Sequence, residues 1–179
     1  MPVLAEALSV IIKKDSIERL YKGGWNQFLM NCNHQTLCYD DDIARVGFMS
    51  PDDVGSFVKQ MQAEGLSYLH NGEALDLTVT DQQTGSLEIA NWLEFTKVDL
   101  SVNGNKQTLP VCQKKDSINK EIVTPKLWVY EGSLSQTFSF VPTEHIDKSL
   151  VFLRHENGCD VYFNKLTGEE SYIGRNDSA

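Results

Sequence analysis

The feature that most constrains the fold of this 179-residue chain is a capped amphipathic helix in its first half. Ser50 is placed to cap the helix N-terminus, and Pro51 suits the first helical position, where no N–H is needed. Asp52 and Asp53 follow at the positive end of the helix dipole. Four apolar side chains then recur at the i, i+3, i+4 and i+7 spacing of one helix face: Val54, Phe57, Val58 and Met61. The sequence therefore predicts a helix over residues 51–64 with one buried face.

The segment before this helix begins with an apolar run and continues into helix signals. Residues 3–12 are rich in Val, Leu and Ile, which predicts a buried strand. Asp15 is placed to cap a short helix, and the Gly23-Gly24 pair is placed to end it. The sequence therefore predicts a strand followed by a short helix in this segment.

Four short apolar segments flank the long helix. Residues 36–39 and 43–48 predict two strands around an acidic turn. Residues 75–79 alternate apolar and polar side chains, which predicts a half-buried strand in a hairpin with residues 66–69. The resulting order of strand, helix, strand, strand, helix, strand is typical of a ferredoxin-like layer, with helices on one face of an antiparallel sheet.

Helix signals nearly vanish in the second half. A large hairpin is predicted between residues 92–102 and 106–111, and two registers are possible. If the loop is Gly-Asn, Leu100 faces Leu109; if it is Asn-Gly, Leu100 faces Gln107. The pairing of two leucines favours the first register.

The rest of the second half predicts short strands separated by turns. These strands are expected at residues 126–130, 136–141, 150–154, 161–163 and 171–173. We therefore expect an α+β protein with a ferredoxin-like, helix-on-sheet N-terminal half followed by a strand-rich antiparallel meander. Two regions are expected, 1–85 and 86–179, and they could share one core.

The net charge is −9, and it is concentrated in the first half of the chain. Residues 1–96 contain 6 basic and 14 acidic residues, whereas residues 97–179 contain 10 and 11. A negative surface disfavours binding to nucleic acid and favours a basic protein partner. We expect the partner surface on two acidic groups that are close in the sequence: Asp40, Asp41, Asp42, Asp52 and Asp53.

No stretch of the sequence has the length and apolarity of a membrane-spanning helix or the pattern of a secretory signal. This pattern predicts a cytoplasmic protein without a membrane partner. The four cysteines are therefore expected as free thiols in a reducing compartment: Cys32, Cys38, Cys112 and Cys159.

One group of residues has the chemistry of a metal site. Cys32, His34 and Cys38 carry the thiolate and imidazole groups that zinc prefers, but a second pair of ligands is missing. The carboxylates of Asp40–Asp42 could bind a hard cation, although an acidic turn exposed to water explains the same residues. We expect no metal and no other cofactor.

Two further pairs could support catalysis if folding brings them together. His145 and Asp147 form one pair, and His155 and Cys159 flank an Asn-Gly turn that could place them face to face. The sequence contains no GxSxG, P-loop, HExxH or GxGxxG motif. These observations favour a protein that is not an enzyme.

Part of the first half resembles a group of uncharacterised bacterial proteins. The resemblance is carried by residues 35–58, QTLCYDDDIARVGFMSPDDVGSFV, by the opening MPVLAEALSVIIKKDSI, and by Trp92-Leu93-Glu94-Phe95. It implies a bacterial, cytoplasmic setting and no particular activity.

Three functions are compatible with these patterns. The first is a non-enzymatic binding protein, such as an inhibitor or immunity protein, that acts on a basic protein partner. The second is a small enzyme or ligand-binding domain with a pocket between the two halves. The third is a homo-oligomer that assembles through exposed edge strands of the second half.

Overall fold

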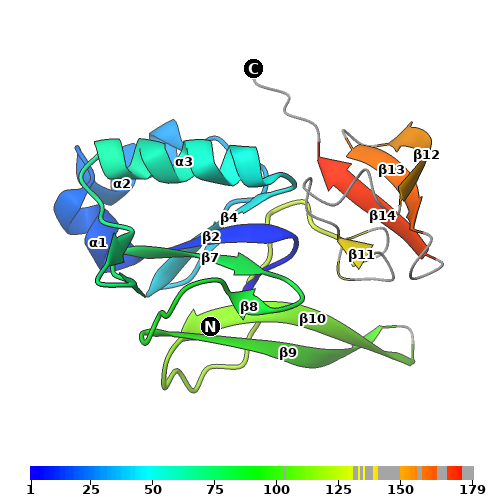
Figure 1. Ribbon diagram of the computed structural model, residues 1–179. Helices are drawn as coiled ribbons and strands as arrows, with labels where there is room; N and C mark the ends of the chain where they lie inside the picture. The colour runs from blue at the N-terminus through cyan, green and yellow to red at the C-terminus, as the bar shows by residue number, and fades with distance from the viewer. Residues whose placement is uncertain are drawn as a thin grey trace.

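The computed structural model shows a mixed α+β fold, as the sequence predicts (Figure 1). The residues that it describes are 1–102, 104–130, 133, 135, 139–140, 150–156, 159–164 and 169–174. The helices are α1 (Lys14–Leu20), α2 (Gly24–Asn31) and α3 (Pro51–Ala63). The strands of the first half are β1 (Val3–Leu4), β2 (Leu8–Lys13), β3 (Cys38–Tyr39), β4 (Ile43–Phe48), β5 (Leu69–His70), β6 (Glu73–Ala74), β7 (Leu77–Asp81) and β8 (Gly85–Ser86). The later strands are β9 (Leu93–Val102), β10 (Asn105–Lys114), β11 (Ser139–Phe140), β12 (Leu150–Glu156), β13 (Cys159–Asn164) and β14 (Glu169–Gly174).

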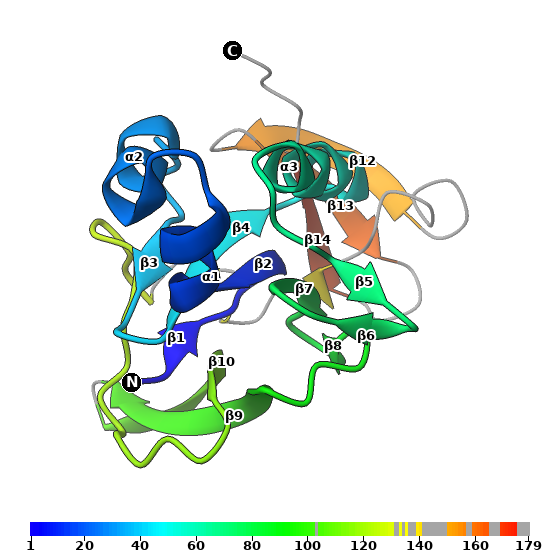
Figure 2. The ribbon, with the colours of Figure 1, turned by 90° about the vertical axis from the view of Figure 1, so that its left-hand side faces the viewer.

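A five-stranded antiparallel sheet forms the middle of the molecule, with strand order β3-β4-β2-β7-β8. Its elements follow the predicted order along the chain: β2, α1 and α2, β3, β4, α3 and β7. The three helices lie on one side of this sheet and the β9–β10 hairpin lies on the other, as Figure 1 and Figure 2 show. The central sheet is therefore covered on both faces.

Helix α3 forms where the sequence predicts it. The Ser50 hydroxyl accepts a hydrogen bond from the backbone N–H of Asp53 at 3.2 Å. The helix runs from Pro51 to Ala63, and Gly65 follows with a φ of 108°, which suits a helix end. Its four apolar side chains pack against the sheet, in a core that includes Leu8, Val10, Ile12, Ile17, Phe28, Ala44, Val46, Leu77 and Val79.

A three-stranded sheet with the order β1-β10-β9 covers the other face of the central sheet. The buried cluster between the two sheets contains residues from both halves of the chain: Val3, Ala5, Ile11, Cys38, Ile43 and Cys112. The regions expected at 1–85 and 86–179 thus contribute side chains to a common core.

The β9–β10 hairpin has the register that the sequence analysis placed second. Leu100 pairs with Gln107, and Leu109 pairs with Val98. Val102 pairs with Asn105, which leaves a two-residue loop, and Gly104 has the positive φ (80°) that such loops require. The expected Leu100–Leu109 pairing was wrong because the turn, rather than one apolar pair, sets the register.

Two predictions near the N-terminus were wrong in detail. Residues 3–12 are not one strand, because Ala7 has a φ of 56° and turns the chain between β1 and β2. These strands belong to different sheets, so the turn is what lets the segment join the two layers. Asp15 lies in the first turn of α1 rather than at its cap, since the helix begins at Lys14.

The predicted pairing of residues 75–79 was also wrong. Strand β7 pairs with β2 in the central sheet, and β5 forms its small hairpin with β6. Strand β7 is buried from Leu77 to Thr80 rather than half-buried.

The C-terminal strands form a four-stranded sheet with the order β11-β14-β13-β12. Three of these strands form the expected antiparallel meander, but β11 pairs with β14 in parallel. Residues 126–130 do not form the expected strand, and of the strand expected at 136–141 only β11 lies within the described residues.

The helices in the described part of the chain are too short or too polar to cross a bilayer.

Candidate functional site

In the acidic turn at residues 40–42, two of the three carboxylates bind other groups of the protein itself. The Asp40 carboxylate is buried, and it accepts hydrogen bonds from the backbone N–H groups of Asp42 and Ile43, both at 2.8 Å. Its second oxygen forms an ion pair with the Met1 amino group at 2.8 Å. Asp40 therefore holds the β3–β4 turn in place and is not exposed to a partner.

The two acidic groups do not form one surface. They lie at opposite ends of β4, whose six residues span about 20 Å. At the turn, Asp42 pairs with Lys114 at 3.2 Å and Asp41 is exposed. At the other end, Asp52 is exposed and Asp53 is half-buried in the first turn of α3. The part of the expected surface that stays accessible is therefore split in two.

The structure separates the three candidate zinc ligands. Cys32 is buried in the core on the helix side of the sheet, and Cys38 is buried on the opposite side. His34 instead packs edge-on against the rings of Phe48 and Phe57, at centroid distances of 5.5 and 5.7 Å. Among the described residues, no three His, Cys, Asp or Glu side chains are placed to hold a metal ion.

The buried cysteines are poor nucleophiles. All four cysteines are free thiols, as expected. Burial raises the pKa of Cys32 to about 11 and that of Cys112 to about 12, so little thiolate exists at neutral pH. Burial, followed by the charges of Asp160 and Glu156, also raises the pKa of Cys159.

The two expected histidine pairs gain no support from the described residues. In the β12–β13 hairpin, His155 pairs with Asp160, and Glu156 pairs with Cys159. His155 and Cys159 are therefore not directly opposite each other. His145 and Asp147 lie outside the described residues.

A buried arginine is the most unusual group in the central sheet. Arg45 lies on β4, on the face turned away from the helices, and is 3% exposed. Its guanidinium donates to the Ser9 hydroxyl at 2.9 Å and to the backbone carbonyls of Thr36 and Glu6 at 3.1 and 2.7 Å. Burial lowers the pKa of Arg45, and the nearby Cys38 and Glu6 oppose that effect.

Two neighbouring residues are adapted to this arginine. Gly47 follows Arg45 on the same face of β4, and a side chain at Gly47 would collide with the guanidinium. The Thr36 hydroxyl binds the same end of β4. It accepts a hydrogen bond from the Gly47 N–H and donates one to the Gly47 carbonyl, both at 3.0 Å.

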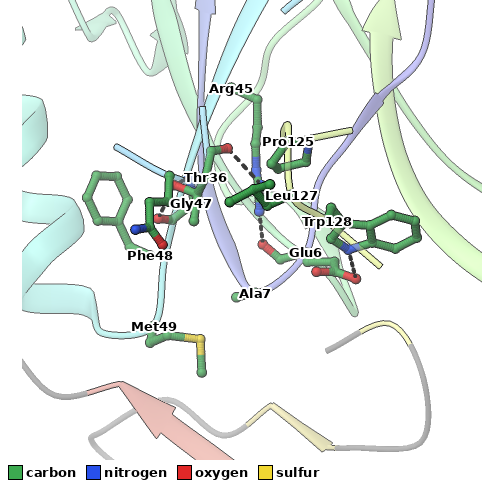
Figure 3. A pocket seen from close by; sticks show the side chains of 11 residues that line it. Glu6, Ala7, Thr36, Arg45, Gly47, Phe48, Met49, Pro125, Leu127 and Trp128 are labelled. Carbon is green, nitrogen blue, oxygen red and sulfur yellow. Dashed lines mark hydrogen bonds between the residues drawn. The ribbon is translucent and has the colours of Figure 1, made fainter. Parts of the chain in front are cut away.

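A cavity of about 250 Å³ opens beside Arg45 (Figure 3). It lies between the sheet and the segment after β10, and its lining includes Arg45, Gly47, Phe48, Pro125, Leu127 and Trp128. The Trp128 ring N–H points away from the guanidinium and donates to the Glu6 carboxylate at 3.1 Å. Residues of both halves thus build this cavity.

A second hollow is an apolar groove of about 520 Å³ along α3. Its floor is formed by buried side chains of α3 and the sheet: Leu8, Val54, Val58 and Val79. Gly55 lies on the helix wall, and a Cβ atom there would meet no atom within 4 Å. Leu87, which also lines the groove, is 55% exposed. The groove is therefore open where a side chain on α3 would otherwise fill it.

The groove, which we call the α3 groove, has more acidic than basic groups around it. Asp81 and Lys59 line it. Glu88 lies near the groove residue Tyr68, whose pKa is raised by burial and then by the charge of Glu88. Asp52 is exposed at the N-terminal end of the helix wall. The arrangement can attract a cationic group to an apolar binding surface.

Sequence reasoning did not identify Arg45, Gly47, Gly55 or the α3 groove as functional candidates. A signal was present for the first pair, since a glycine inside a predicted strand marks a close approach of another group. A glycine inside the strongest predicted helix was the corresponding signal for the groove.

Comparison with protein-family models, with curated proteins and with solved structures finds no match for this chain.

Proposed function

We propose that the protein is a non-enzymatic binding protein whose α3 groove takes a basic, partly apolar segment of a protein partner. The carrying observation is Gly55, a glycine in the interior of a well-capped helix with open space above it. Glycine destabilises a helix interior by about 0.5–1 kcal/mol relative to alanine, so its presence beside an apolar groove suits close approach of a ligand.

Charge supports a basic partner for this groove. Three carboxylates lie on or near its rim, Asp52, Asp81 and Glu88, and Lys59 is the basic side chain that lines it. The exposed Leu87 and the apolar floor would hold an apolar anchor of the partner. Inhibitor or immunity proteins of the bacterial cytoplasm, which block a basic partner, fit this chemistry.

The test uses two labelled synthetic peptides with the same pattern of leucines. In one the intervening residues are lysine and arginine, and in the other they are glutamate. Fluorescence anisotropy is expected to give a Kd of about 10–100 µM for the basic peptide and at least tenfold weaker binding for the acidic one. Raising the NaCl concentration from about 50 to about 500 mM should weaken the basic complex several-fold.

Two substitutions at one position localise the binding. Gly55→Trp fills the groove and should abolish binding of the basic peptide. Gly55→Ala is the matched control, since its Cβ meets nothing in the unbound protein; its single methyl group should weaken binding far less than the Trp side chain, while stabilising the fold by about 0.5–1 kcal/mol. Equal binding of the two peptides, or a Gly55→Trp variant that binds normally, would rule the proposal out.

A second candidate function is self-assembly through β12. This strand lies at the edge of the C-terminal sheet, and three consecutive apolar side chains are 42–49% exposed: Val151, Phe152 and Leu153. Exposed apolar edge strands tend to pair between chains. Light scattering at increasing protein concentration tests this candidate, and a monomer at all concentrations would remove it.

A further inference from the structure

The cavity beside Arg45 shares no lining residue with the α3 groove and has different chemistry. We infer that this cavity is a second binding site, which takes a small carboxylate with a compact apolar body. The inference is independent of the proposed protein partner, because it rests on the Arg45 guanidinium and not on the groove.

The guanidinium of Arg45 is buried without an anionic partner in direct contact. Its hydrogen bonds go to neutral acceptors: the Ser9 hydroxyl and the backbone carbonyls of Thr36 and Glu6. None of the ion pairs among the described residues includes Arg45. A buried cation is strongly destabilising unless its charge is compensated, so a ligand carboxylate in the adjacent cavity would find a favourable site.

The nearest carboxylate, that of Glu6, is engaged elsewhere. One of its oxygens accepts hydrogen bonds from the Trp128 ring N–H and from the backbone N–H of Ser135, both at 3.1 Å, and from the Ser135 hydroxyl. The contact between Glu6 and Arg45 is through the Glu6 backbone carbonyl. The Glu6 side chain therefore fixes the segment that forms the cavity wall. Glu6 also lines the cavity and its charge acts on Arg45, but no salt bridge joins the two groups.

The rest of the cavity suits an apolar body. Phe48, Met49, Pro125 and Trp128 contribute to its walls, and Leu127, which also lines it, is 85% exposed. A volume of about 250 Å³ corresponds to about eight non-hydrogen atoms at the share of volume that a water molecule occupies in the liquid. Benzoate has this size and chemistry, and benzamide is its uncharged counterpart.

The experiment titrates the ¹⁵N-labelled full chain with benzoate and, separately, with benzamide. The Trp128 ring N–H and the Arg45 Nε–H report directly on the cavity in amide correlation spectra. We expect saturating shifts of both signals with benzoate, a Kd of about 1 mM, and at least tenfold weaker binding of benzamide. No shift at about 20 mM benzoate, or equal affinity for the two probes, would overturn the inference. Arg45 would then serve only the fold, by hydrogen bonds between β4 and β2.

Matched substitutions at Leu127 keep the test independent of folding, since this side chain is mostly exposed. Leu127→Glu adds a negative charge at the opening and should weaken benzoate binding several-fold, whereas Leu127→Lys should strengthen it. Benzamide is uncharged, so neither variant should change its affinity in the way that it changes the affinity for benzoate. Identical benzoate affinities for the two variants would contradict a carboxylate bound within reach of this opening.

Discussion

The two faces of the central sheet are both buried, but they are built from different chemistry. The face toward the helices is apolar, with side chains such as Val10, Val46 and Val79 in contact with α1 to α3. The face toward β9 and β10 carries Ile11 and Ile43 but also several buried polar groups: Ser9, Arg45, Thr78 and Thr80. One sheet therefore joins an ordinary hydrophobic core to a polar network.

The two faces should differ in how well they tolerate changes in side-chain packing. Apolar contacts are not directional, so the helix side can accept small rearrangements. On the polar side each group depends on a particular partner, as when Thr80 donates to the Ser9 carbonyl and Arg45 donates to the Ser9 hydroxyl. A buried polar group that loses its partner is destabilising by about 1–3 kcal/mol, so substitutions on this face should couple strongly to one another.

The largest expected effect is on the helix side. Phe28 is fully buried and contacts the rings of Tyr21 and Trp25, both at 5.5 Å between centroids. Phe28→Ala should lower the free energy of unfolding by about 3–5 kcal/mol in urea titrations, because it removes a large apolar side chain and leaves a cavity. Met30→Ala on the same helix is the control, since Met30 is 77% exposed, and should change it by less than about 0.5 kcal/mol. If Phe28→Ala lowered the free energy of unfolding as little as Met30→Ala does, α2 would not be packed against the sheet.

On the polar side, the expected effect is smaller but depends on a second residue. Gly47→Ala should lower the free energy of unfolding by about 1–3 kcal/mol, because the new methyl group meets the Arg45 guanidinium. The penalty should disappear in an Arg45→Ala background, which a double-mutant cycle measures. An equal penalty in both backgrounds would show that strain in β4, and not the arginine, excludes a side chain at this position.

The sequence predicted the helix side well and the polar side poorly. The helix α3 has local signals for its start, its end and its buried face, and all of them hold. In β7, Thr78 and Thr80 alternate with apolar residues, which imitates a strand that faces water on one side. Both threonines are fully buried because a second sheet covers them, and their hydroxyls bond within the central sheet, to the Ser86 hydroxyl and the Ser9 carbonyl. Alternation alone cannot distinguish a polar face in water from a polar network under another sheet.

The candidate sites were hidden from sequence reasoning for a related reason. The Arg45 cavity joins residues near positions 6, 45 and 128, and only the fold brings them together. The acidic residues attracted attention as a sequence cluster, yet β4 separates them and Asp40 is used to hold a turn. Charge counted along a chain does not show which carboxylates remain exposed.

The smallest expected effect concerns pH and the edge of the helix-side core. Partial burial against Phe48 and Phe57 lowers the pKa of His34 below its usual value of 6.5, and the charge of Asp53 partly opposes this. Because the unfolded chain then binds a proton more readily, the free energy of unfolding should fall as the pH drops below 6.5. The change should be small, since His34 is exposed on one side, and His34→Gln should reduce it. An NMR titration of the His34 ring tests the cause directly. Asp53→Asn should lower the His34 pKa further, whereas a wild-type pKa at or above 6.5 would show that the aromatic contact does not desolvate the ring.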